Sequence, residues 1–212
     1  MDNHQLYIIS GLGADHRVFQ YMNFSGYEVT HIQWITPLKK ESIEDYAKRL
    51  SAQIKTPNPT LIGMSFGGMM AIEIGKQLKT EKIILIASVK TKNEIPFYLK
   101  TVGQLHHIIP TVILKTSTPI SRWFFGIREG RDRKLFSTIC RETDPVFFNW
   151  AVDKIVNWKN TVIPPKVKHI QGSSDRIFPV NYVKADVVIP NGGHFMTVDK
   201  AELLTSAVRN LL

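Results

Sequence analysis

One short segment of the chain has residue types that could make a serine hydroxyl reactive. Residues 63–67 read Gly-Met-Ser-Phe-Gly, a G-x-S-x-G pattern with Ser65 at its centre, between a predicted strand and a predicted helix. A nucleophile on so sharp a strand-to-helix turn needs small neighbours, because the bent backbone brings the flanking residues together. The free N–H groups at the start of the helix, near Phe66, could bind an oxyanion. The competing interpretation is a serine that caps a helix after a glycine turn.

Two later segments contain an acid and a base that could serve this serine. A serine hydroxyl needs a base to take its proton, and that base needs an acid to orient it. Asp175 follows one predicted strand and His194 follows the next, at the carboxyl ends where open parallel sheets gather their sites. Read singly, the aspartate is a turn residue and the histidine a solvated loop residue. Read together, in the order serine, aspartate, histidine, they favour a triad.

The elements that must position these residues alternate between strands and helices. Strands are predicted at 6–9, 27–34, 60–64, 83–87, 167–170 and 185–189, and helices at 42–54, 66–78 and 198–212. The run 83–87 is apolar at every position, which is typical of a strand that helices cover on both faces of a parallel sheet. We therefore predict an α/β fold, a three-layer α/β/α sandwich whose mostly parallel sheet has about six strands.

The alternation stops in the middle of the chain, between residues 89 and 159. This segment contains four prolines and three of the four tryptophans, Trp123, Trp150 and Trp158. Apolar residues at helical spacing predict short helices within 97–109 and 145–158. We expect a helical lid or cap inserted into a core made of residues 1–88 and 160–212. The alternative is a pair of ordinary crossover helices joined by a long loop.

The composition excludes several classes of protein. The chain has 212 residues, of which 43% are hydrophobic and 21% charged, as in globular rather than disordered proteins. Its single cysteine, Cys140, excludes an internal disulfide framework and a cysteine-rich zinc site. No apolar run is long enough to span a bilayer, and the N-terminus lacks the basic region and cleavage site of a signal peptide. We expect a cytoplasmic protein with no transmembrane segment.

The positive charge is concentrated in the predicted lid. The chain has 27 basic and 18 acidic side chains, a formal net charge of +9. Residues 90–134 contain nine basic and three acidic side chains, and so carry six of the nine net charges. A strongly basic balance is a reason to consider nucleic-acid or membrane-surface binding. Such a binder has no need of a Ser-His-Asp set, and we do not expect a nucleic-acid partner.

The motif segments together resemble a known superfamily. Residues 63–68, 172–179 and 192–195 are similar to the nucleophile elbow, acid loop and histidine loop of the α/β-hydrolases, in particular small serine hydrolases of esterase type. The resemblance covers 5–88 and 160–212. It implies Ser65 as nucleophile, Asp175 as acid and His194 as base, with an oxyanion hole from the backbone N–H groups of Leu12 and Phe66. It implies no metal and no organic cofactor.

The sequence departs from the family pattern in three places. Ser10 stands where relatives often have a histidine before the glycine, which weakens the assignment of Leu12. The stretch between Asp175 and His194 is shorter than usual for the family. The two leading antiparallel strands of larger relatives have no counterpart here, so the resemblance implies a reduced form of the fold.

The implied reaction is acyl transfer to water. We expect a carboxylesterase-like serine hydrolase that cleaves an ester-type bond in a small molecule through an acyl-enzyme. A thioesterase or a carbon–carbon hydrolase would use the same residues, whereas a dehalogenase would need a carboxylate in place of Ser65. The alternative from another class is a non-catalytic ligand-binding or receptor-like protein on the same scaffold.

The aromatic and basic residues of the predicted lid suggest how substrate could bind. We assign Phe97, Trp123 and Arg122 to substrate binding, with Arg122 and Arg128 as a cationic rim for an anionic substrate. The equally acceptable interpretation is that these cations form a solvated face. The oligomeric state is left open.

Overall fold

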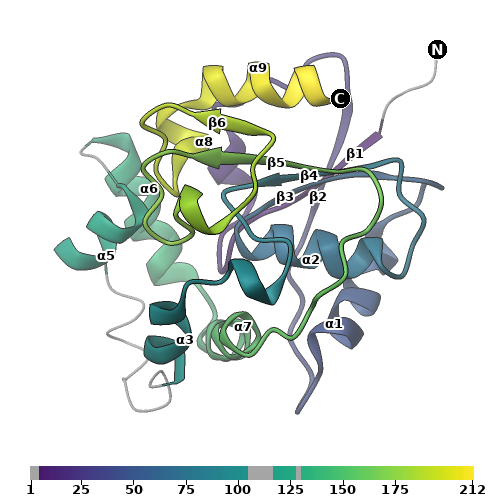
Figure 1. Cartoon of the computed structure of the whole chain (residues 1–212), viewed down its shortest axis with the longest axis horizontal. Coiled ribbons are helices and arrows are strands. Elements are labelled where there is room, and N and C mark those ends of the chain that lie inside the picture. Colours follow the sequence, from purple (N-terminus) through teal and green to yellow (C-terminus); the bar gives the residue numbers. More distant parts are fainter. Residues whose placement is uncertain (1–4, 105–116, 128–129) are drawn as a thin grey trace.

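The computed structural model describes residues 5–104, 117–127 and 130–212 of the chain. Within these ranges, six strands form one sheet in the order β2-β1-β3-β4-β5-β6, and every neighbouring pair is parallel (Figure 1). The strands are β1 (Gln5–Ile9), β2 (Glu28–Ile32), β3 (Thr60–Met64), β4 (Lys82–Ile86), β5 (Val167–Gly172) and β6 (Val187–Ile189). The predicted mostly parallel sheet is therefore confirmed.

Helices flank the sheet on both faces. They are α1 (Ile43–Leu50), α2 (Phe66–Gly75), α3 (Phe97–Gln104), α5 (Pro119–Phe125), α6 (Arg131–Glu142), α7 (Pro145–Val156), α8 (Met196–Asp199) and α9 (Ala201–Leu211). Short 3₁₀ turns lie at η1 (His16–Phe19), η2 (Ser51–Gln53), η3 (Lys92–Glu94) and η4 (Val180–Tyr182). Figure 1 shows α1 and α2 on one side of the sheet and α9 on the other, which makes three layers.

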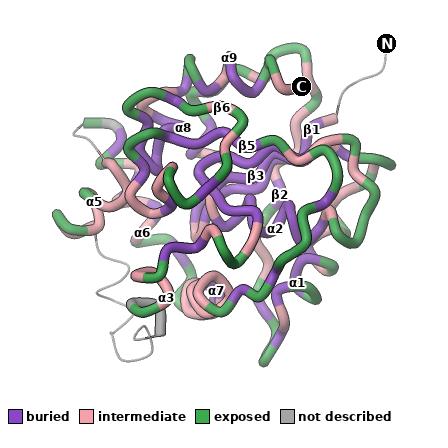
Figure 2. Tube along the Cα trace, in the orientation of Figure 1, coloured by how far each residue is buried: buried purple, intermediate pink, exposed green. Residues whose placement is uncertain are grey.

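The central strands β1, β3 and β4 are mostly apolar because both of their faces are covered. Along β1, Tyr7 and Ile9 belong to the apolar cluster that includes α1 and α2, whereas Leu6 and Ile8 belong to the cluster that includes α8 and α9. Successive side chains of a strand point to opposite faces, so a strand between two helical layers buries both sets of side chains. Figure 2 shows the resulting buried band through the centre of the molecule.

Some helices end where the sequence predicts, and others are shorter or interrupted. Ser42 caps α1, its side chain accepting a hydrogen bond from the Asp45 N–H at 3.0 Å, as the predicted N-cap requires. The predicted helix 42–54 is shorter, because α1 ends at Leu50 and a 3₁₀ turn follows. The predicted helix 198–212 is two helices, since the backbone at Lys200 (φ −124°, ψ 25°) leaves the helical region between α8 and α9.

The helices of the middle segment lie beside the edge of the sheet at which the strands end (Figure 1). Ile139 of α6 joins one apolar cluster, and Phe147 and Ala151 of α7 join the other. Part of the helix expected within 97–109, from residue 105 on, lies outside the described residues, as does Arg128. No helix among those described is long and apolar enough to cross a membrane.

Candidate active site

Ser65 lies on a strained turn between β3 and α2. Its φ of 53° and ψ of −122° fall where a residue with a side chain is rarely found. Two hydrogen bonds to the end of β4 and the loop after it stabilise the turn. The Ser65 N–H donates to the Ile86 carbonyl at 2.9 Å, and Ser88 Oγ donates to the Ser65 carbonyl at 2.6 Å. A Cβ at Gly67 would lie 2.2 Å from the Ser10 carbonyl oxygen, so only glycine fits beside this serine.

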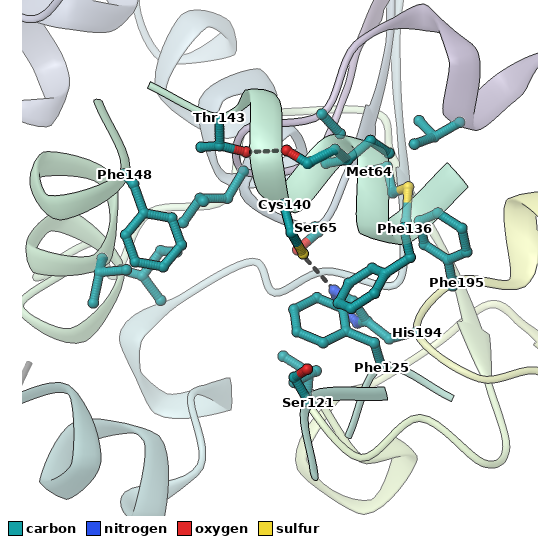
Figure 3. A pocket seen from close by; sticks show the side chains of 18 of the residues that line it. Met64, Ser65, Ser121, Phe125, Phe136, Cys140, Thr143, Phe148, His194 and Phe195 are labelled. Carbon is teal, nitrogen blue, oxygen red and sulfur yellow. Dashed lines mark hydrogen bonds between the residues drawn. The ribbon is translucent and has the colours of Figure 1, made fainter. Parts of the chain in front are cut away.

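The three residues of the predicted triad form one hydrogen-bonded chain. His194 Nε2 lies 2.8 Å from Ser65 Oγ (Figure 3). His194 Nδ1 lies 2.9 Å from Asp175 Oδ2. Asp175 follows β5 and His194 follows β6, while Ser65 follows β3, so all three lie at the carboxyl edge of the sheet. The exposed fractions of Asp175 and His194 are 3% and 2%, which removes the acid and the base from competing water.

The environment of Asp175 determines the tautomer of His194. Its Oδ1 accepts hydrogen bonds from the backbone N–H groups of Ile177 and Phe178, at 2.8 Å and 3.0 Å, and its Oδ2 accepts one from Gln171 Nε2 at 2.9 Å. Both oxygens of this carboxyl group thus act as hydrogen-bond acceptors. His194 Nδ1 must therefore carry the proton, which leaves Nε2 free to accept the Ser65 hydroxyl proton.

Two apolar rings enclose the imidazole. The rings of Phe125 and Phe178 lie 5.5 Å and 5.7 Å from that of His194, each near edge-on. Phe125 comes from α5 and Phe178 from the loop that carries Asp175. Neither residue was predicted to contact the base.

The two candidate oxyanion donors lie at the site. Phe66 directly follows Ser65 as the first residue of α2, and Leu12 lines the same cavity as Ser65. In the described part of the chain, neither N–H donates to a protein acceptor. The turn that carries Leu12 is held by Ser10, whose Oγ donates to the Ala14 carbonyl at 2.6 Å. The residue that departs from the family pattern thus stabilises the turn.

An apolar cavity of about 260 Å³ opens over Ser65 and His194 (Figure 3). Its walls come from α5, α6 and α7 and from the loop after β5. They include the side chains of Leu99, Phe125, Phe136, Ile139, Cys140, Phe148, Val152, Ile155 and Ile177. Among the residues that the structure describes, no acidic side chain and no lysine or arginine lines this cavity.

The residues predicted to bind substrate lie away from this cavity. The side chains of Phe97 and Trp123 are largely exposed, at 71% and 57%, and neither lines the cavity over Ser65. Arg122 and Trp123 instead line a second, polar cavity of about 490 Å³. The physical reason is the rotation of α5, whose Ser121 and Phe125, one helical turn apart, face the first cavity. In this structure Phe97, Trp123 and Arg122 therefore do not line the cavity over Ser65.

Some of the residues that line the cavity over Ser65 follow a pattern that is visible in the sequence. Phe136, Ile139 and Cys140 recur at helical spacing on α6, and with Thr143, which directly follows the helix, they line the cavity together. That periodicity marks an inward face, although it does not say which cavity the face meets. Among the described residues, no group of three or more His, Cys, Asp or Glu side chains is arranged to hold a metal ion.

Solved structures resemble the whole chain, although no protein-family model and no curated protein sequence matches it. A hydrolase from Oleispira antarctica superposes with a TM-score of 0.77 and 14% identity, covering 99% of this chain and 91% of that one. A bromoperoxidase from Bacillus anthracis has a TM-score of 0.75 and 16% identity over the same shares. An esterase from Exiguobacterium antarcticum has a TM-score of 0.72 and 16% identity, covering 98% and 91%. At such identities the likeness concerns the fold, and the chain has the α/β-hydrolase fold that its motifs led us to expect.

Proposed function

We propose that the chain is a serine hydrolase that cleaves an ester-type bond in a small molecule. The observation that carries the proposal is the unbroken hydrogen-bonded chain from Ser65 through His194 to Asp175 at the floor of an apolar cavity. Several structures with the same fold are named as hydrolases or esterases, which supports the reaction class by analogy.

The reaction follows from the positions of the three side chains. Ser65 Oγ attacks the ester carbonyl while His194 Nε2 takes its proton, and Asp175 stabilises the imidazolium. The Leu12 and Phe66 N–H groups stabilise the oxyanion, each by about 3 to 4 kcal/mol in comparable sites. The carbon–oxygen bond to the alcohol then breaks, and His194 returns the proton to the leaving alcohol. Water repeats the attack on the acyl-enzyme and releases the acid.

The lining of the cavity favours an uncharged, apolar acyl group. A charged group there would lose its hydration without gaining a partner, since no ionised side chain among the described residues lines the walls. At about 260 Å³ the cavity lies just below the usual range for drug-sized ligands, which favours a short or medium acyl chain or a single aromatic ring. The anionic substrate expected from the basic residues is therefore not our preferred substrate.

We further propose that residues 89–159 act as the lid over a core of 1–88 and 160–212. Helices α5, α6 and α7 supply most of the apolar wall, whereas the core supplies Ser65, Asp175 and His194.

Labelling with a fluorophosphonate, together with turnover of p-nitrophenyl esters, tests the function. We expect a covalent adduct on Ser65, mapped by mass spectrometry, and a loss of at least a thousandfold in kcat/KM in Ser65→Ala. Ser174→Ala is the control, because Ser174 lines the second cavity and should leave turnover unchanged. Absence of both adduct and turnover over a range of acyl lengths would instead favour the ligand-binding alternative. Comparing an ester with the thioester of the same acid separates the esterase from the thioesterase.

A further inference from the structure

Two polar side chains lie in the interior beside Asp175. His169 and Gln171 lie on either side of Ile170 on β5, point to the same face and are fully buried. Burying an amide and an imidazole costs free energy unless their polar atoms are hydrogen-bonded. Two apolar side chains at these positions would have been enough to fill the interior. The hydrogen bonds that His169 and Gln171 make therefore indicate why polar side chains stand here.

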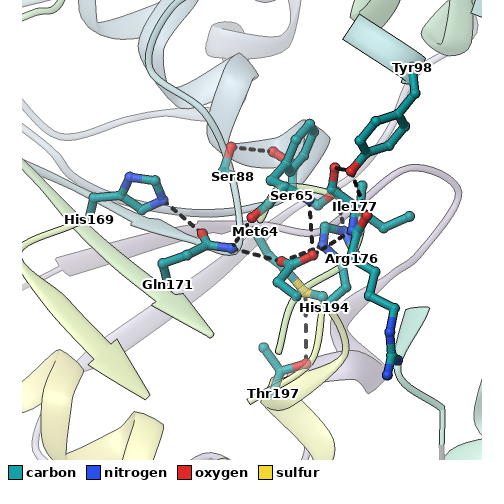
Figure 4. Close-up of polar contacts among 12 residues, drawn as sticks. Met64, Ser65, Ser88, Tyr98, His169, Gln171, Arg176, Ile177, His194 and Thr197 are labelled. Atoms are coloured by element: carbon teal, nitrogen blue, oxygen red, sulfur yellow. Dashed lines mark hydrogen bonds and ion pairs between the residues drawn. The ribbon is translucent and has the colours of Figure 1, made fainter. Parts of the chain in front are cut away.

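The hydrogen bonds of Gln171 allow only one orientation of its amide. Its Nε2 donates to Asp175 Oδ2 at 2.9 Å and to the Phe178 carbonyl at 2.7 Å (Figure 4). A carbonyl oxygen only accepts, so a flipped amide would place oxygen against oxygen at both positions. Gln171 therefore presents a fixed N–H to the oxygen of Asp175 that also receives His194.

His169 holds the other end of this amide. Its Nε2 lies 3.1 Å from Gln171 Oε1, and because that oxygen only accepts, Nε2 carries the proton. Its Nδ1 is buried and has no hydrogen-bond partner among the described residues. Burial, and then the positive charge of Lys90, lower the pKa of His169 to about 4, although Asp186 and Asp175 act in the opposite direction. The imidazole is thus a neutral donor at neutral pH.

We propose that Gln171 is a positioning residue for the reaction, acting through Asp175, and that His169 fixes the Gln171 amide for this task. The inference rests on the proposed function. Oδ1 of Asp175 is held by two backbone N–H groups, but among the described residues Oδ2 has only Gln171 besides His194. The Gln171 bond keeps Oδ2 in line with His194 Nδ1. It also draws charge from the carboxylate, so that the carboxylate attracts a positively charged imidazole less strongly than it would without this bond.

The first test replaces Gln171 by methionine, which has similar length and no donor. We expect kcat for a p-nitrophenyl ester to fall about tenfold, the worth of one hydrogen bond to a charged group, with KM within about twofold. The acidic limb of the kcat/KM profile should move to higher pH. Ile170→Val is the matched control. Ile170 is buried next to Gln171 on β5, but its side chain packs in the apolar cluster that includes α8 and α9. It should lose stability while keeping kcat and the pH profile.

The second variant, Gln171→Glu, gives an answer even if the methionine variant does not fold. A protonated Glu carboxyl can donate to Asp175 as the amide does, whereas an ionised one repels Asp175. Burial beside a like charge raises the pKa of such a carboxyl. We therefore expect the activity of Gln171→Glu relative to wild type to fall as the pH rises from 5 to 8. Tyr98, which donates its hydroxyl proton to the Arg176 carbonyl at 2.8 Å, is a further titratable group near Asp175 and is unchanged in both variants.

The outcomes separate the inference from the function on which it rests. A wild-type protein without turnover would overturn the proposed function, and the inference with it. An active wild type, with a folded methionine variant that keeps its kcat and pH profile, would overturn the inference alone. A constant ratio of Gln171→Glu to wild-type activity across the pH range would do the same.

Discussion

Two cavities lined by described residues lie a short distance apart and differ in their chemistry. The cavity over Ser65 is lined mainly by aromatic and aliphatic side chains, and its hydroxyl and imidazole groups belong to Ser65, Ser121, Thr143 and His194. The second cavity is lined by the charged side chains Arg122, Arg176, Lys200 and Asp199, together with Ser174 and Asn191. A narrow contact separates them, since a Cβ at Gly126 would lie 3.1 Å from Gly193 Cα.

The contrast places Arg122 and Ser65 on different surfaces. Arg176 lies over the ring of Trp123, 4.3 Å from its centroid, and donates to the Trp123 carbonyl at 2.8 Å. This stacking joins α5 to the loop that carries Asp175 on the solvated side of the wall. His194 and Asp175, by contrast, are buried, and each of their polar groups needs a hydrogen-bond partner within the protein.

We expect the largest effect of this contrast on the free energy of unfolding, through the fully buried His169. Because the pKa of His169 falls from 6.5 to about 4 on folding, the unfolded chain binds more protons between these pH values. The stabilisation is complete above about pH 6.5 and is lost as the pH falls toward 4, a loss of about 3 kcal/mol. Urea unfolding of the wild type at pH 7 and pH 4 measures the loss, which His169→Gln should lack.

A half-buried histidine supplies the control for this experiment. The pKa of His31 is also lowered, first by burial and then by the charge of His16, but its side chain is partly exposed. His31→Gln should therefore remove a smaller part of the acid destabilisation. If the free energy of unfolding depended equally on pH in the wild type and in the His169 variant, the interior beside Asp175 would be accessible to water.

The size of the apolar cavity sets the next effect, which is on substrate preference. Phe148 lines the cavity over Ser65 and is only partly buried, so Phe148→Ala should enlarge the cavity without unfolding the chain. We expect the best p-nitrophenyl ester to become longer, with a gain of about fourfold in kcat/KM for each added methylene that the cavity accepts. Trp123→Ala, at the second cavity, should leave the chain-length preference unchanged. A shift in the Trp123 variant and none in the Phe148 variant would reverse the roles of the two cavities.

The same contrast shows how far the sequence could lead. Ser65, Asp175 and His194 could be proposed as a group because parallel strands end at one edge, so residues that follow β3, β5 and β6 must come close. The face that a lid helix turns inward depends on packing against the rest of the molecule, which local periodicity does not specify. On α5 the apolar and aromatic residues surround the helix, and Trp123 was as plausible a wall residue as Phe125.

Gln171 was missed for a related reason. A polar residue in a strand reads the same in the sequence whether it meets solvent or a buried carboxylate. Only the position of Asp175 four residues later, which turns the carboxylate back onto the strand, distinguishes the two cases. The nucleophile turn needed no such information, since its glycines are required by the backbone itself.

The smallest effect concerns Arg122, the residue expected to attract an anionic substrate. Arg122 donates to the Ser117 carbonyl at 2.7 Å and lines the second cavity, on the far side of the Gly126 contact from Ser65. Arg122→Gln should therefore change KM by less than about twofold, and equally for a neutral ester and for an anionic ester of the same acyl group, because a charge outside the cavity is largely screened by solvent. Steady-state kinetics at low and high salt with both esters measure the difference. A rise in KM for the anionic ester alone, abolished by salt, would place the cationic surface on the substrate path and unite the two cavities in one function.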